Sequence, residues 1–170
     1  CNDCNTNYQK QYYYGNSNAN ILIINDNATN DKDILEYFDT LLEMSEVDIN
    51  DIFIINAVSC ITTRKDKEEM IQRIPSKKEC NNCKCFINQA IKIVNPRIII
   101  SLGATALNQF IPGSNLLEYI DTKQVFNGIP TLINYSVKVK YGLSIFNDVY
   151  INTNDSNGFI NTKNEISGLI

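Results

Sequence analysis

Residues 53–60 read Phe-Ile-Ile-Asn-Ala-Val-Ser-Cys, and residues 98–107 read Ile-Ile-Ile-Ser-Leu-Gly-Ala-Thr-Ala-Leu. Each run begins with β-branched and other apolar residues and ends in polar or turn-forming residues, which is typical of a buried strand in a parallel sheet. Four of the six cysteines lie between residue 53 and residue 107. Cys60 ends the first run, and Cys80, Cys83 and Cys85 lie between the two runs. Open α/β folds bind their ligands at the carboxyl ends of parallel strands. The stretch therefore predicts a parallel sheet with a cysteine-bearing site at its carboxyl edge.

The rest of the chain repeats this alternation of strand and helix. Four segments are predicted to be strands of the sheet: 21–24, 52–58, 97–102 and 131–135. Apolar residues at helical spacing predict helices that begin at a cap on Asn30 or Asp31, at Asn82 and at Ala104. Residues 61–79 are predicted to be a long connection, and 123–127 a minor strand. We therefore expect a three-layer α/β/α sandwich with a central parallel sheet of about four strands.

Length and composition limit the possible functions. The 170 residues fit one domain, which we assign to residues 1–150, with 151–170 as a linker-like tail. The net charge of −4 gives no overall attraction for nucleic acid, so any such contact must be local. The chain has no His, which excludes a His base, nucleophile partner or metal ligand. No apolar run approaches the ~20 residues of a membrane span.

Cysteine spacing indicates metal chemistry. The sequence has no recognisable secretory signal, and it begins at Cys1 without Met, so we expect it to be a fragment of a cytoplasmic protein. Two Cys-x-x-Cys pairs, Cys1/Cys4 and Cys80/Cys83, accompany Cys60. Scattered buried thiols are one alternative. A zinc site on the two pairs is another, although it leaves Cys60 unexplained.

The ordered motifs resemble those of a known family. A Cys-x-x-Cys pair comes first, then a strand with an acidic loop, a strand ending in Asn-x-x-x-Cys, a Cys before an aromatic-led helix, and Leu-Gly-Ala-Thr-Ala. This pattern resembles the iron–sulfur uracil-DNA glycosylases of family 4, over residues 1 to about 150. The resemblance implies a [4Fe–4S] cluster held by Cys1, Cys4, Cys60 and Cys83, with Cys80 as the alternative fourth ligand.

The same resemblance places the catalytic positions. Asp26 stands where the family has a Glu that acts on water, and Asn56 matches the Asn that reads the base. The segment that carries the family's stacking Phe is missing. The family's His position falls on Ser136.

We therefore predict a catalytically degenerate glycosylase-like domain that retains a cluster and DNA affinity. Similar domains are fused to some bacteriophage DNA polymerases, so the expected partners are DNA and the rest of a larger replication or repair protein, in a bacterial or phage-infected cell. The candidate DNA contacts are Arg64, Lys65, Ser136, Lys138 and Lys140. The alternatives are an active glycosylase with an altered pocket, or a zinc-stabilised protein-interaction domain.

Overall fold

A mixed sheet forms the centre of the molecule. The computed structural model describes residues 13–44, 47–120 and 122–138. In these residues a six-stranded sheet has the order β1-β3-β2-β6-β8-β7. Its strands are β1 (Tyr13–Gly15), β2 (Ile21–Asn27), β3 (Ile52–Val58), β6 (Ile98–Leu102), β7 (Lys123–Phe126) and β8 (Ile129–Asn134). The four central strands are parallel, as predicted, and β1 and β7 add antiparallel edges.

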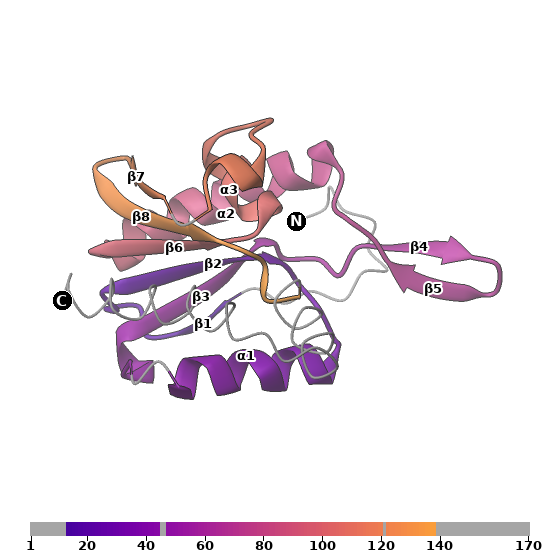
Figure 1. Cartoon of the computed structure of the whole chain (residues 1–170), viewed down its shortest axis with the longest axis horizontal. Helices are drawn as coiled ribbons and strands as arrows, with labels where there is room; N and C mark the ends of the chain where they lie inside the picture. The colour runs from indigo at the N-terminus through magenta and orange to yellow at the C-terminus, as the bar shows by residue number, and fades with distance from the viewer. Residues whose placement is uncertain (1–12, 45–46, 121, 139–170) are drawn as a thin grey trace.

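Helices cover both faces of this sheet (Figure 1). On one face α1 (Lys32–Met44) contributes Phe38 to an apolar cluster with Ile23 and Ile54. On the other face α2 (Lys77–Val94) packs with Leu22 and Ile24, and the short α3 (Ala104–Phe110) packs there too. Side chains of successive strand residues point to opposite faces, so β2 supplies both clusters. The three-layer α/β/α sandwich is confirmed. The remaining helical turns are η1 (Ile49–Asp51) and η2 (Leu116–Glu118).

Helix α2 begins at Lys77, so the predicted start at Asn82 is wrong. Ser76 Oγ accepts a hydrogen bond from the Glu79 N–H (3.3 Å), and the Glu79 carboxylate accepts one from the Ser76 N–H (2.7 Å). This reciprocal capping box satisfies two backbone donors at the helix end. The earlier start places Cys80, Cys83 and Cys85 on one helix. The helix ends at Val94, and Asn95 takes the left-handed conformation (φ 48°) before Pro96.

The predicted long connection is a β-hairpin. Strands β4 (Thr63–Asp66) and β5 (Glu69–Gln72) pair in antiparallel register around a turn at Lys67, whose φ is 55°. The hairpin projects from the body of the molecule (Figure 1). Most of its side chains are exposed, so it lacks the apolar alternation that identifies a half-buried strand. In the described residues, no helix combines the length and the apolar composition needed to cross a membrane.

Candidate functional site at the carboxyl edge of the sheet

Asp26 lies near the carboxyl end of β2, and its carboxylate is hydrogen-bonded to helix α3. Its Oδ1 accepts a hydrogen bond from the Thr105 N–H of α3 at 2.7 Å. A Cβ added to Gly103 would lie 2.8 Å from Asp26 Cγ and 2.9 Å from Ser136 Cβ. The structure therefore brings Asp26 and Ser136 together around Gly103, as the convergence of parallel strand ends predicts.

Asn56 lies on the opposite face of the sheet from Asp26. It pairs in register with Asn25 and follows Ile54, which packs towards α1. Asp26 instead follows Ile24, which packs towards α2. Because side chains alternate along each strand, the structure does not bring the two predicted catalytic residues together.

Two of the candidate DNA contacts follow β8 and are held by the protein. Ser136 is buried, and its Oγ accepts a hydrogen bond from the Lys138 N–H at 3.3 Å. Lys138 Nζ donates to Asn27 Oδ1, also at 3.3 Å. Burial lowers the pKa of Lys138 against the opposing influence of the Asp26 and Asp31 carboxylates. Lys138 is thus a half-buried amine on the same sheet edge as Asp26.

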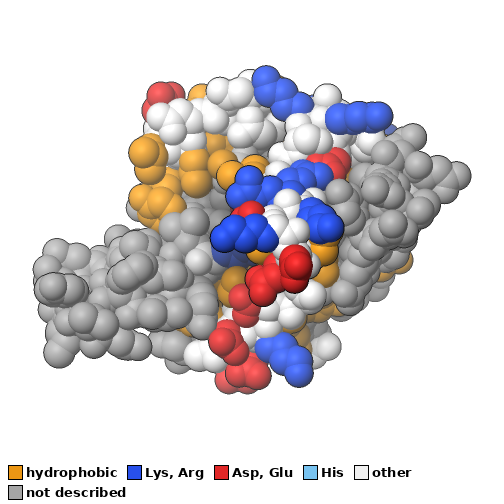
Figure 2. All heavy atoms as spheres, turned by 90° about the vertical axis from the view of Figure 1, so that its right-hand side faces the viewer, with side chains coloured by type: hydrophobic (Ala, Val, Ile, Leu, Met, Phe, Trp, Pro, Cys, Tyr) orange, Lys and Arg blue, Asp and Glu red, His pale blue; other side chains and the backbone are white. Residues whose placement is uncertain are grey.

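The other described candidates lie on the hairpin. Arg64 and Lys65 are exposed on β4. Basic side chains gather on this side of the molecule, next to acidic ones (Figure 2). A hollow of about 620 Å³ borders the hairpin turn, and its described lining comprises Asp66, Lys67, Glu68, Glu69 and Ile71. Lys140 lies outside the described residues.

The structure brings Cys60 and Cys83 together. Cys60 follows β3 and Cys83 lies on α2, and both are buried in one cluster with Val58. Cys80 and Phe86 pack against this cluster, whereas Cys85 is exposed. Burial raises the pKa of Cys80, and the Glu79 and Asp26 carboxylates raise it further. Cys1 and Cys4 lie outside the described residues.

The surroundings of these thiols fit a thiolate-bound cofactor. Cys60 and Cys83 share a buried apolar cluster with Val58, and the buried Glu79 carboxylate, which is paired with Arg73, lies one helical turn before Cys83. The residue before Cys83 in the sequence is Asn82, whose Nδ2 is buried without a hydrogen-bond partner in the described structure. Hydrogen-bond donors near sulfur are one of the features that tune iron–sulfur clusters. Among the described residues no three potential ligands converge, so a four-thiolate site needs cysteines from the rest of the chain.

Gln109 links the cysteine helix to the sheet and was not predicted. Its Nε2 donates to the Ala57 carbonyl and to the Cys80 carbonyl, both at 3.2 Å. Gln109 is buried on α3, although it is polar. Its place on the inner face of a helix that begins at the Leu-Gly-Ala-Thr-Ala run is the only sequence signal that could have identified it.

Comparison with known proteins identifies the fold family. Residues 12–147 match the model of the uracil DNA glycosylase superfamily. The chain belongs to this superfamily. It is also similar to the type-4 uracil-DNA glycosylase of Thermotoga maritima, with 34% identity over 76 residues. That alignment covers 45% of this chain and 36% of the relative, so the chain matches about a third of that glycosylase's length.

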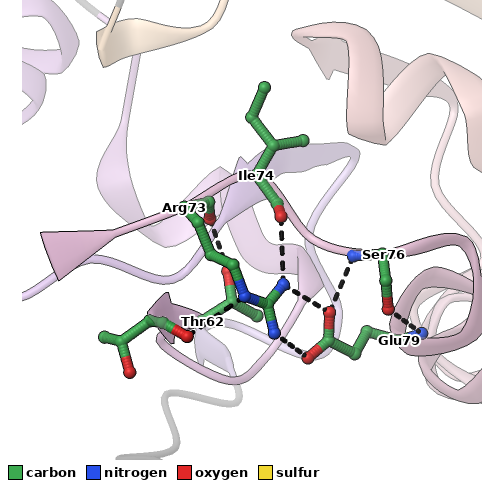
Figure 3. Close-up of polar contacts among 6 residues, drawn as sticks. Thr62, Arg73, Ile74, Ser76 and Glu79 are labelled. Carbon is green, nitrogen blue, oxygen red and sulfur yellow. Dashed lines mark hydrogen bonds and ion pairs between the residues drawn. The ribbon is translucent and has the colours of Figure 1, made fainter. Parts of the chain in front are cut away.

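An ion pair fixes the hairpin of this glycosylase-superfamily domain to its cysteine helix (Figure 3). The Arg73 guanidinium donates to both Glu79 oxygens, at 2.9 and 2.7 Å. Arg73 also donates to the carbonyls of Thr63 and Ile74, and the Thr62 hydroxyl donates to the Arg73 carbonyl. These bonds therefore hold together the two ends of the segment between Cys60 and Cys80.

The hairpin is also attached to the loop after β2. Gln72 Nε2 donates to the Ala28 carbonyl at 2.7 Å, and the Thr29 hydroxyl donates to Gln72 Oε1 at 3.3 Å. Together with the Arg73–Glu79 pair, these bonds connect the loop next to Asp26 with the amino end of α2.

We expect Glu79→Gln to destabilise the domain in a pH-dependent way. Hydrogen bonds from Arg73 chiefly lower the pKa of Glu79 from its ordinary 4.5 to about 2. The ionised carboxylate therefore contributes fully to the free energy of unfolding above about pH 5. This contribution is lost as the pH falls from about 5 to about 2. At about pH 7 we expect a loss of about 1–3 kcal/mol in the free energy of unfolding.

Urea unfolding of both proteins at about pH 7 and about pH 3 measures this difference. Glu36→Gln, at an exposed position on α1, is the control and should change stability little at either pH. An equal loss from Glu79→Gln at both pH values would contradict the assigned role of the ion pair.

Proposed function

We propose that this chain is a glycosylase-like domain that holds a [4Fe–4S] cluster and binds DNA without excising uracil. We further propose that it serves as a DNA-binding or structural module of a larger replication or repair protein, of the kind found in bacteriophage polymerases. Membership of the superfamily and similarity to a type-4 uracil-DNA glycosylase support the DNA and cluster parts of this proposal. The observation that carries the loss of activity is the hydrogen bond between Asp26 and α3.

The Asp26 carboxylate acts as a helix cap. Its Oδ1 accepts the Thr105 N–H at 2.7 Å, in the first turn of α3, and the carboxyl carbon lies against the backbone of Gly103. A carboxylate that positions water must direct its oxygen lone pairs at the substrate site. The capping bond occupies one of these oxygens, so Asp26 is poorly placed for that task.

The other catalytic groups do not compensate for this arrangement. Asn56 extends from the face of the sheet that α1 covers, and the chain has no His to stabilise charge on the departing base. Loss of one such electrostatic donor typically costs roughly 10²–10³ in rate. We therefore expect uracil excision to be slower by several orders of magnitude than in an active glycosylase.

The proposed cluster ligands are Cys60 and Cys83 together with Cys1 and Cys4. Cys60 and Cys83 meet in one buried apolar cluster, and Cys80 at its border is the alternative fourth ligand. Thiolates are the preferred ligands of iron–sulfur clusters. Bound there, the cluster would supply a covalent connection between the end of β3, helix α2 and the amino-terminal cysteines. We assign it a structural role.

The proposed DNA contacts use local positive charge on an otherwise acidic protein. Arg64 and Lys65 are exposed on the projecting hairpin, while Lys138 lies on the adjoining sheet edge. Lysine and arginine contacts to phosphate position a protein on DNA without reading its sequence. We therefore propose weak, salt-sensitive and sequence-independent binding, with Lys140 as a further contact.

We expect the double variant Arg64→Ser/Lys65→Ser to bind duplex DNA more weakly than the unmodified protein. Each phosphate contact that is lost should reduce the slope of log K against log salt by about 1, so the slope should fall by about 2. Fluorescence anisotropy of a labelled duplex across a salt series measures the slope. Lys92→Ser, at an exposed site on the last turn of α2, is the matched control.

Absence of DNA binding by the unmodified protein at low salt would contradict the proposed function. A colourless, zinc-containing protein that does not bind DNA would instead favour a protein-interaction domain.

A further inference from the structure

Lys138 is a cationic side chain in an unusual position for a simple phosphate contact. It follows β8 on the same sheet edge as Asp26, and it is half-buried. The neighbouring Ser136 packs beside Gly103, at the end of β6, and bonds the Lys138 backbone. The ammonium group is therefore held where three parallel strands end, on the edge at which folds of this type bind their ligands.

The immediate partner of Lys138 is neutral. Its Nζ donates to the amide oxygen of Asn27 at 3.3 Å. Among the described residues the ion pair is Arg73–Glu79, and Lys138 takes no part in it. Burial lowers the pKa of Lys138 and outweighs the Asp26 and Asp31 carboxylates, which favour the charged ammonium, so the fraction of neutral amine increases. A desolvated lysine amine is the form that attacks carbonyl carbons.

We propose that Lys138 forms a Schiff base with the aldehyde of an abasic deoxyribose in DNA. This inference rests on the proposed DNA binding, because abasic deoxyribose is the sugar left when a base is removed from DNA. It adds a covalent capture of damaged DNA to the proposed binding role, at a residue that otherwise contributes only charge.

The reaction needs no oxidant or reductant. The Nζ lone pair attacks C1′ of the ring-opened sugar, an N–C bond forms, and the carbonyl oxygen takes up a proton. The resulting carbinolamine loses its hydroxyl group and a proton as water, which leaves a C=N double bond. The net change is amine plus aldehyde to imine plus water, and hydrolysis reverses it.

Borohydride trapping tests this inference directly. A labelled oligonucleotide with one abasic site is incubated with the full chain in sodium cyanoborohydride, which reduces an imine to a stable amine. We expect a covalent protein–DNA adduct on a denaturing gel, and its peptide map should place the DNA on Lys138. Lys138→Arg retains the positive charge but cannot form the imine, so it should reduce the adduct by at least roughly tenfold.

The control is Lys32→Arg, which changes an exposed lysine at the start of α1, next to the same edge. It should leave the adduct unchanged. An adduct equally strong in Lys138→Arg, or mapped to other lysines, would overturn the inference. The peptide map of the unmodified protein decides the question even if the Arg variant folds poorly.

Anisotropy with the same abasic oligonucleotide separates the two proposals. DNA binding without an adduct overturns the Schiff base and leaves the proposed function standing. Failure to bind DNA overturns both.

Discussion

With the proposed cluster bound, replacing Cys60 or Cys83 with Ser is expected to remove most of the iron from the protein and to unfold it at a much lower temperature. Both thiols are buried in one apolar cluster, where they meet the end of β3 and the first half of α2. The free energy of metal binding at a structural site is folding free energy, on the order of 10 kcal/mol for structural zinc in zinc-finger peptides. Loss of one ligand therefore threatens both the cluster and the fold.

The measurement is iron and acid-labile sulfide per chain after anaerobic purification, together with absorbance near roughly 400 nm. We expect each of the two variants to fall to a small fraction of the unmodified value. Cys85→Ser is the matched control, because Cys85 is exposed on the same helix. Cys80→Ser decides the fourth ligand. If this variant retains its iron, the fourth ligand is Cys83. If Cys80→Ser loses its iron while Cys83→Ser retains it, the fourth ligand is Cys80.

Thiols that serve only as packing, and bind no cluster, would give a different result. In that case Cys60→Ser would cost about 1–3 kcal/mol for burying a hydroxyl, and the unmodified protein would carry no iron. That outcome would contradict the proposed cluster.

Gly103→Ala is expected to destabilise the domain strongly while leaving every cysteine in place. Gly103 has a φ of 96°, which a residue with a Cβ rarely adopts. The new methyl group would also lie 2.8 Å from Asp26 Cγ and 2.9 Å from Ser136 Cβ. Backbone strain and overpacking each cost about 1–3 kcal/mol, so we expect a loss of about 2–6 kcal/mol.

Thermal unfolding monitored by circular dichroism tests this estimate, with an expected fall in Tm of roughly 5–15 °C. Gly113→Ala provides the control, because Gly113 has a similar φ of 80° but no atom within 4 Å of its added Cβ. It should show only the cost of backbone strain. Equal losses at the two positions would mean that Asp26 and Ser136 do not pack closely against Gly103.

The sheet could be predicted from the sequence because its strands are buried on both faces. Ile52–Val58 and Ile98–Leu102 read as apolar runs, and the structure places both in the parallel centre of the sheet. The meeting of Cys60 with Cys83 also follows from their places after a strand and on the next helix. Convergence at the carboxyl edge is a property of parallel sheets and does not depend on side-chain detail.

The segment between these cysteines could not be predicted, because its structure depends on hydrogen bonds and not on burial. The hairpin strands are charged and exposed, so they carry no apolar period. The start of α2 had a usable signal in Ser76 and Glu79, but the pairing of Glu79 with Arg73 depends on the hairpin that precedes it.

The catalytic positions show a different limit of sequence reasoning. A resemblance assigns Asp26 and Asn56 by their order along the chain, but their faces follow from strand register. The register Asn25↔Asn56 places Asn56 opposite to Asp26, and the bond from Thr105 gives Asp26 a capping role.

The most direct measurement is single-turnover excision of uracil, with anaerobically purified protein in excess over a labelled uracil-containing oligonucleotide. Alkali treatment converts each abasic site into a strand break that a denaturing gel resolves. We expect strand breaks no faster than in a protein-free control, although the same DNA is bound. Excision at an enzyme-limited rate that Asp26→Asn abolishes would contradict the proposed loss of activity and establish an active glycosylase.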